Sequence, residues 1–188
     1  MLDNLMNLVK EHAGDAIVNN PAIPNDRNEE AIAETGNSIT SGLQNMLAGG
    51  NIKEVLGMFS GQSGASASSP VVQNLSGGLA DKLVNQFGLD RNAAGGIANS
   101  MIPAVLQKLV KKTNDPNDSS FDLQGIFNTL SNGKTQGTNI QQLLGKLTQG
   151  GLDKDGDGDT DLQDVKAMFS SNQAGNSGIF DTVKGLFN

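Results

Sequence analysis

Helical spacing of apolar residues, interrupted at short intervals by glycine, proline and asparagine, is the feature that most constrains this chain. In residues 2–18 apolar side chains recur every three or four positions, as they do along one face of an amphipathic helix. The 24 glycines among 188 residues supply many of the interruptions. Sustained alternation with β-branched residues, the signature of a strand, is nearly lacking. The sequence therefore predicts an all-α fold, a multihelical bundle with polar joints.

Helix-terminating residues divide this bundle into predicted elements. The first helix ends at residues 19–24, which contain two prolines, and a second helix is predicted over residues 28–48. Two longer helices are predicted over residues 71–87 and 90–112, with a turn at Gly88 between them. Pro103 lies inside the second of these, and we expect it to kink that helix or to split it near Met101.

A short unit recurs at residues 51–62, 122–133 and 139–150. Each copy begins with Asn or Asp, continues with apolar residues at helical spacing, and ends with Ser or Thr close to a Gly. The first residue is suited to accept hydrogen bonds from the free amides of a helix, and the Gly permits a left-handed exit. Isolated helices of this length are marginal in water, so we expect these three to pack on the rest of the protein.

Composition also suggests where the chain divides. Residues 61–70 are rich in Gly and Ser, as flexible linkers are. The predicted division is an N-terminal helical segment at residues 1–60, a linker at 61–70, a helical domain at 71–149, an acidic loop with its exit helix at 150–170, and a linker with an apolar C-terminal helix at 171–188.

The helical domain carries a family resemblance. Residues 79–90, LADKLVNQFGLD, and residues 102–106, IPAVL, resemble a widespread bacterial family of unknown function, the YidB-like all-helical domains. The resemblance extends over about residues 71–147. It implies a helical fold for residues 71–149 and a bacterial origin, and it brings no catalytic role with it.

Residues 153–164 contain the one motif with evident chemistry. They hold six aspartates and one lysine, which together carry −5 of the net charge of −7. Ca²⁺ takes six to eight oxygen ligands, and aspartates at loop positions one, three and five, with Gly158 at position six, resemble an EF-hand calcium loop. The final aspartate is similar to that of dockerin loops. The predicted calcium ligands are Asp153, Asp155, Asp157, Asp159, Asp161 and Asp164.

Two alternatives accompany this prediction. The segment could be a solvated acidic turn, although the Asp-Gly alternation and the apolar residues that follow it favour calcium. Residues 114–122 could be a degenerate second calcium site, but Pro116 and the missing central Gly make them a poor candidate. A single loop of this kind is expected to bind Ca²⁺ weakly, at about 10⁻⁵ to 10⁻³ M.

Several classes of function are disfavoured. The chain has no Cys, Trp or Tyr, which removes thiolate metal sites and the usual stacking platforms for single-stranded nucleic acid. No basic face for a duplex and no apolar run of membrane-spanning length is evident, and no signal sequence is legible, so a cytoplasmic location is expected. Nothing supports an enzyme; the weak candidates are His12, Ser63 and the residues 133–135, which echo the end of a phosphate-binding loop.

Two hypotheses about function follow. The first is a non-enzymatic calcium-binding protein in which Ca²⁺ orders residues 153–169 and fixes the C-terminal helices. The second is a self-assembling or scaffold protein, a homo-oligomer or a partner of another protein, that uses apolar helices such as residues 179–187, with calcium only as reinforcement. Docking of that segment on its own core is favoured over exchange between molecules.

Overall fold

The computed structural model describes residues 2–61, 64–118, 120–131, 133, 139–142 and 145. Within these ranges all regular structure is helical, which confirms the all-α prediction for the described part of the chain. The elements are α1 (Leu2–Ala13), the π-helical turn η1 (Gly14–Val18), the 3-10 turn η2 (Asn25–Arg27), α2 (Asn28–Ala48), α3 (Ile52–Phe59), α4 (Pro70–Phe87), α5 (Arg91–Thr113) and α6 (Leu123–Leu130).

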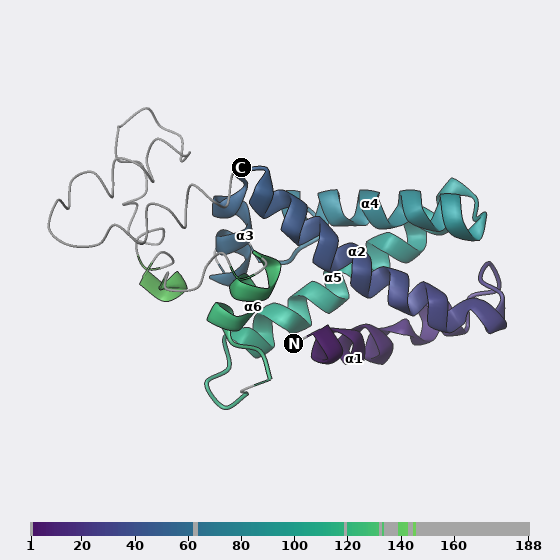
Figure 1. The fold of residues 1–188 in the computed structure, drawn as a ribbon. Coiled ribbons are helices and arrows are strands. Elements are labelled where there is room, and N and C mark those ends of the chain that lie inside the picture. The colour runs from purple at the N-terminus through teal and green to yellow at the C-terminus, as the bar shows by residue number, and fades with distance from the viewer. Residues whose placement is uncertain are drawn as a thin grey trace, which may run out of the picture.

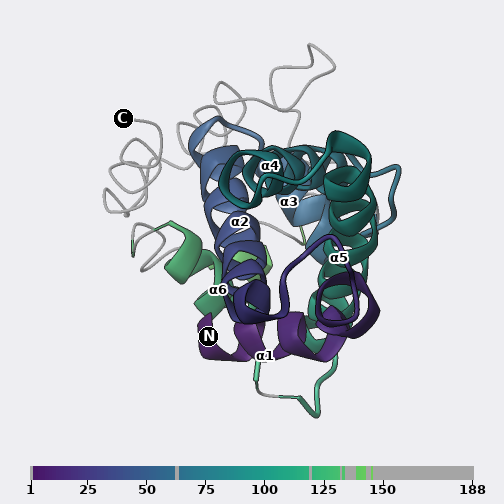
Figure 2. The ribbon, with the colours of Figure 1, turned by 90° about the vertical axis from the view of Figure 1, so that its right-hand side faces the viewer.

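The longer helices pack around a shared interior (Figure 1). α4 and α5 form a helical hairpin, α2 packs along α4, and α1 packs against α5 and α2. The view in Figure 2 shows α2, α4, α5 and α1 arranged around this interior. The short helix α3 contacts α2, α4 and α5, while α6 contacts α2. Each of the described α-helices therefore packs against at least one other helix of the same bundle.

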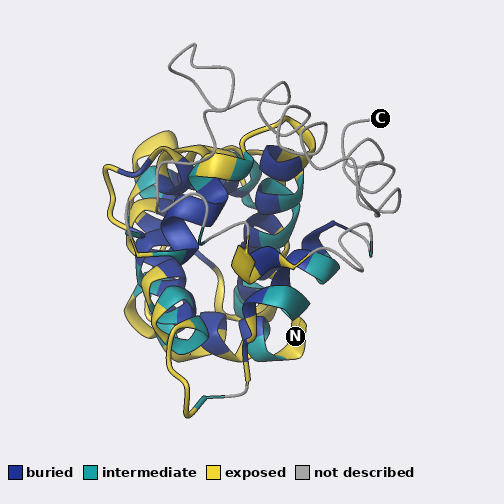
Figure 3. Cartoon of the chain, turned by 90° about the vertical axis from the view of Figure 1, so that its left-hand side faces the viewer, coloured by how far each residue is buried: buried dark blue, intermediate teal, exposed yellow. Residues whose placement is uncertain are grey.

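One continuous apolar core holds these helices together. Its buried side chains come from every α-helix and extend along the chain from Leu5 to Ile140. Figure 3 shows the buried residues on the inner faces of the helices and the exposed ones outside. In this core the rings of Phe59 on α3 and Phe127 on α6 meet edge to face, with 5.9 Å between their centroids. The two short helices are thus anchored by contact with each other as well as with the long helices.

Two glycines on α2 permit its close approach to neighbouring helices. A Cβ atom at Gly36 would fall on the Sδ atom of Met6 in α1, and a Cβ atom at Gly42 would fall on the Cδ2 atom of Leu75 in α4. Leu75 is only 2% exposed, so it has little room to move away. Glycine at these two positions is therefore part of the packing between α2 and its neighbours.

The α4–α5 hairpin follows the sequence prediction. α4 ends at Gly88, which adopts φ 68° in the left-handed region, and Asp90 caps α5 by accepting hydrogen bonds from the backbone of Asn92 and Ala93. The alternative that Pro103 splits α5 is wrong, because α5 runs unbroken from Arg91 to Thr113. Proline removes a single intrahelical donor, and the buried residues around Pro103 hold both halves of the helix against the core.

Two residues of the predicted linker at residues 61–70 pack against this body. Ala65 is buried, and its carbonyl oxygen accepts a hydrogen bond from Nε2 of Gln107 on α5 at 3.2 Å. Ser69, which precedes α4, is also buried. Helices before and after this connection contribute to the same core, so residues from the predicted segments 1–60 and 71–149 pack directly against one another.

The recurring short unit is helical in its described parts. α3 and α6 end at Ser60 and Ser131, and Gly61 and Gly133 follow with φ values of 77° and 84°. The prediction that the first residue caps each helix is confirmed for the second copy, where Asp122 Oδ1 accepts from the Gly125 backbone at 2.7 Å.

The capping prediction is wrong for the first copy. The Asn51 side chain makes no capping hydrogen bond to α3, and its Nδ2 instead donates to the carbonyl of Met46, at 3.4 Å. The backbone N–H of Asn51 donates to the same carbonyl at 2.9 Å, so this residue completes the end of α2. Because Asn51 completes the end of α2, it does not adopt the extended backbone of an N-cap residue for α3.

Candidate functional site

The predicted calcium ligands Asp153, Asp155, Asp157, Asp159, Asp161 and Asp164 lie outside the described residues, as do residues 171–188. The candidate site is therefore defined by sequence, and the structure supplies the part of the chain that leads to it. The described residues nearest to it in sequence are 139–142 and Gly145. Their geometry shows where residues 139–142 attach to the helical body.

The third copy of the short unit begins against α6. Asn139 Oδ1 accepts from the backbone of Gln142 at 3.0 Å, which confirms the predicted cap. Ile140, Gln141, Gln142 and Gly145 are helical. The Ile140 side chain is 2% exposed and belongs to the apolar core, and its backbone N–H donates to Oε1 of Gln124 on α6 at 3.2 Å. The chain thus enters the segment before the aspartates from a fixed, buried point.

The acidic loop between α5 and α6 was considered as a second calcium site. Its carboxylates at Asp115 and Asp118 accept hydrogen bonds from groups of the protein. Asp118 accepts a hydrogen bond from Lys112 Nζ at 2.7 Å and from the Ser120 backbone at 2.9 Å. Asp115 accepts from the Asn117 backbone at 2.9 Å. The Lys112 hydrogen bond, followed by those from Ser120, holds the pKa of Asp118 well below its usual range. These carboxylates stabilise the turn, and the described residues contain no group of three or more potential metal-ligating side chains.

A cluster around Arg27 was not found by sequence reasoning. Its guanidinium donates to both carboxylate oxygens of Glu30 at 2.8 and 2.9 Å and to the carbonyl of Gln86 at 3.2 Å. It also lies over the ring of Phe87, 4.2 Å from the centroid. The cluster fastens the start of α2 to the end of α4. Glu30 is a local partner three residues along the chain, but no local pattern identifies the contacts with Gln86 and Phe87, which are about 60 positions away.

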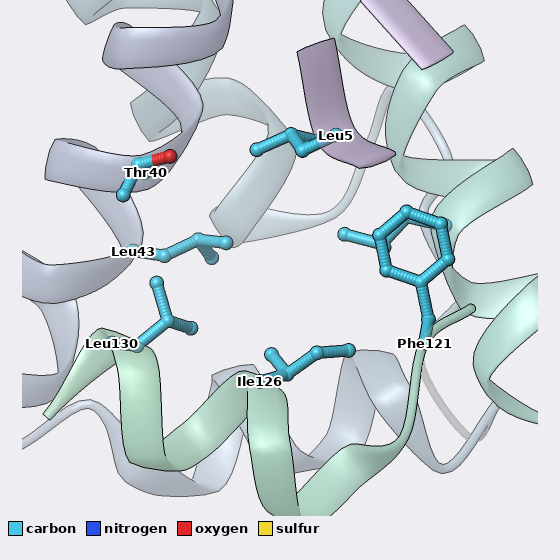
Figure 4. A pocket seen from close by; sticks show the side chains of 7 residues that line it. Leu5, Thr40, Leu43, Phe121, Ile126 and Leu130 are labelled. Atoms are coloured by element: carbon cyan, nitrogen blue, oxygen red, sulfur yellow. The ribbon is translucent and has the colours of Figure 1, made fainter. Parts of the chain in front are cut away.

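One small cavity lies between α1, α2, α5 and α6 (Figure 4). Its volume is about 10 Å³, room for about one water-sized sphere, and its exposed lining is apolar; the Thr40 hydroxyl donates to the carbonyl of Gly36 at 3.0 Å. A substrate or cofactor does not fit in this space. The lining side chains are those of Leu5, Thr40, Leu43, Leu109, Phe121, Ile126 and Leu130.

Of the weak catalytic candidates His12, Ser63, Lys134 and Thr135, the structure describes His12. Nδ1 of His12 lies 3.0 Å from the carbonyl oxygen of Leu8, one turn earlier in α1. Ser63 and the Lys-Thr pair at positions 134–135 lie outside the described residues. Among the helices that the structure describes, none combines the length and the apolar character that crossing a bilayer requires.

Comparison with known proteins adds no family to this description. No family model, no curated protein and no solved structure matches the chain. The likeness of residues 71–147 to the YidB-like domains therefore stays a prediction from the sequence.

Proposed function

We propose that this chain is a non-enzymatic calcium-binding helical protein, in which Ca²⁺ orders residues 153–164 and the helix expected after them. The observation that carries the proposal is the spacing of the six aspartates around Gly158. In an EF-hand arrangement, side chains at positions one, three and five converge on the ion, position seven contributes its backbone carbonyl, and positions nine and twelve complete the shell. These positions are occupied by Asp153, Asp155, Asp157, Asp159, Asp161 and Asp164.

The described aspartates show how this chain stabilises a carboxylate without a metal ion. Asp90, Asp115, Asp118 and Asp122 each accept from a backbone N–H two or three residues later in the sequence. Asp118 adds Lys112, with which it forms an ion pair. The residues that donate in these turns carry no negative charge; they are Asn92, Ala93, Asn117, Ser120 and Gly125.

The aspartate-rich segment offers such donors only at the three-residue spacing, where Gly156, Gly158, Thr160 and Leu162 follow the first four aspartates. From Asp153 to Asp159, the residue two positions after each aspartate is another aspartate. Drawing that residue's N–H towards the first carboxylate also brings the second carboxylate closer. Two carboxylates about 4 Å apart repel by roughly 1 kcal/mol in water and by roughly 4 kcal/mol at an effective dielectric of 20. Lys154 is the single cation among these residues, so a divalent cation is the natural partner of the set.

Calorimetric titration with CaCl₂ tests the proposal. The wild-type chain is expected to bind one Ca²⁺ with a dissociation constant of about 10⁻⁵ to 10⁻³ M. The double variant Asp155→Ala/Asp157→Ala is expected to lose the binding heat. The control Asp3→Ala/Asp81→Ala removes the same charge from α1 and α4 and is expected to bind like the wild type. Equal heats in the wild type and the Asp155/Asp157 variant would contradict the proposal, and MgCl₂ serves as the ionic control.

Self-assembly is the second candidate, favoured by the apolar character of residues 178–187. Light scattering of the full chain and of a chain ending at residue 177 separates the two. A monomer in both cases supports the calcium-binding protein alone, whereas an oligomer that is lost on truncation supports assembly through this segment. The cytoplasmic location stays a prediction.

A further inference from the structure

The loop between α5 and α6 contains the one Asp–Pro peptide bond of the chain, because each of the other prolines follows a residue of another type. Asp115, Pro116 and Asn117 are all exposed, so water reaches this bond. At an ordinary aspartate, the backbone nitrogen of the next residue can attack the side-chain carboxyl. A proline nitrogen carries no hydrogen, so that route is closed. The reverse attack, of the carboxyl group on the backbone carbonyl carbon, remains open.

Two hydrogen bonds hold the groups that would react. Oδ1 of Asp115 accepts from the backbone N–H of Asn117 at 2.9 Å, which folds the carboxyl group back over the peptide that joins Asp115 to Pro116. The carbonyl oxygen of Asp115 accepts from the backbone N–H of Asp118 at 3.1 Å. This second donor polarises the carbonyl and stabilises the oxyanion that an attack would form. The turn therefore brings a nucleophile, a carbonyl carbon and an oxyanion donor together.

The residues on both sides of this turn are attached to the rest of the protein. On one side, the Asp118 carboxylate accepts from Nζ of Lys112 on α5 at 2.7 Å and from the Ser120 backbone at 2.9 Å. On the other side, Nδ2 of Asn114 donates to the carbonyl of Phe59, the last residue of α3, at 2.8 Å. These contacts restrict the motion of the turn, so the approach of the carboxyl group to the carbonyl carbon is pre-organised.

We propose that the chain cleaves itself between Asp115 and Pro116. Oδ2 of the protonated Asp115 carboxyl group attacks the carbonyl carbon of the same residue and closes a five-membered cyclic anhydride. The bond from that carbon to the proline nitrogen breaks, and the nitrogen takes up the carboxyl proton and leaves as a secondary amine. One water molecule then opens the anhydride, so residues 1–115 end in a carboxyl group and residues 116–188 begin with an amine. This proposal does not depend on the calcium site.

The two products are expected to stay together after the cut. Phe59 on α3 and Phe127 on α6 lie on opposite sides of the cleaved bond along the chain, and their rings meet in the core with 5.9 Å between the centroids. Phe121, which follows the cut, is also buried. Cleavage therefore converts one chain into two that share a core, and it gives the segment that begins at Pro116 a free end.

Intact mass spectrometry of the full chain, incubated in mildly acidic buffer, tests the proposal. The expected products are residues 1–115 and 116–188, formed at a rate that is unchanged by dilution because the reaction is intramolecular. Asp115→Asn and Asp115→Glu are expected to give neither product, since the first lacks the carboxyl group and the second would have to close a larger ring. The folded chain is expected to cleave about tenfold faster than the same chain in guanidinium chloride, which removes the two hydrogen bonds.

The turn at Asn20 and Pro21 provides a matched control. Asn20 Oδ1 accepts from the Ala22 backbone, and the Asn20 carbonyl oxygen accepts from the Ile23 backbone, both at 3.0 Å. Its hydrogen bonds thus match those of the Asp–Pro turn, but an amide is a poorer nucleophile than a carboxyl group. The wild-type chain is expected to stay intact at this turn, and Asn20→Asp is expected to introduce a second cut after residue 20.

Three results would overturn the proposal. The first is a wild-type chain that stays intact in its folded form or cleaves no faster than the unfolded chain. The second is a fragment that persists in Asp115→Asn, which would come from a protease. The third is an Asn20→Asp chain that is cut after residue 115 alone, because the two hydrogen bonds would then not be what promotes the reaction.

Discussion

The contact between α2 and α4 makes a sharp test of the packing, because one substitution can be placed in two environments. A Cβ atom at Gly42 falls on Leu75 Cδ2, whereas a Cβ atom at Gly96 on α5 meets nothing within 4 Å. Both glycines lie inside helices, so Gly→Ala brings the same gain in helix propensity, about 1 kcal/mol, at each position. The difference between the two variants therefore isolates the clash.

The size of that difference follows from the burial of Leu75. At 2% exposure this side chain cannot turn into solvent, so the extra methyl group must displace packed neighbours at a cost of about 1–3 kcal/mol. Gly96→Ala is expected to be more stable than the wild type by about 1 kcal/mol. Gly42→Ala is expected to be less stable than Gly96→Ala by about 1–3 kcal/mol, which corresponds to about 2–4 °C in Tm for each kcal/mol.

Chemical denaturation with urea, followed by circular dichroism, measures both values. Gly36→Ala provides an intermediate case, because the Met6 side chain that the new methyl group would meet is flexible and only partly buried. The free energy of unfolding of this variant is expected to lie between those of the other two. If Gly42→Ala proved as stable as Gly96→Ala, the close approach of α2 to α4 would be refuted.

Two further predictions concern α6 and the loop before it. The pKa of Asp118 is depressed by Lys112 and Ser120, so its contribution to stability is complete above the unfolded value of about 4 and is lost as the pH falls towards the folded value. Melting curves of Asp118→Asn and wild type should therefore differ most near neutral pH and converge in acid; a constant gap would contradict the ion pair. Asp122→Ala removes the side chain that caps α6 at Gly125 and should lower the free energy of unfolding, measured by urea titration, by about 1 kcal/mol. An unchanged free energy of unfolding would show that this cap does not stabilise the protein.

Much of the helical architecture could be predicted from the sequence because its signals are local. The predicted helix over residues 28–48 coincides with α2, and the turn at Gly88 separates α4 from α5 as expected. Gly61 and Gly133 adopt the predicted left-handed conformation after the short helices. In each case the signal is the spacing of apolar residues in the helix and a glycine directly after it, so the helix and its end can be predicted without knowledge of tertiary contacts.

The errors arise where tertiary contacts or neighbouring elements compete with a local preference. Asn51 has a side chain suited to capping α3, but its side chain and its backbone N–H both donate to the carbonyl of Met46 at the end of α2. Pro103 favours a break, but burial of the surrounding residues keeps α5 continuous. The Arg27–Phe87 contact joins positions that only the fold brings together. Such contacts leave no mark on a single sequence, since either partner alone is an ordinary surface or helix residue.

The candidate site differs from the fold in this respect. All six predicted ligands fall within residues 153–164, so their chemistry can be read without knowing how the helices pack. By contrast, no pattern in the sequence predicts that Gln124 on α6 bonds the first residue of the third short helix. The ligands of the site are thus a local prediction, whereas the contact between Ile140 and Gln124 is a finding of the structure.

The concentration of charge in one segment also determines how coordination can be separated from simple screening. Residues 153–164 carry −5 of the net −7, so any salt relieves part of their mutual repulsion. At 0.1 M ionic strength the Debye length is about 10 Å, so salt weakens the repulsion between exposed charges farther apart than that but does not replace ligands in contact with an ion. An effect of Ca²⁺ that persists in 0.1 M NaCl, and that MgCl₂ does not reproduce, requires oxygen atoms arranged for a large cation with six to eight ligands. An effect that NaCl removes belongs to the charge of the segment alone.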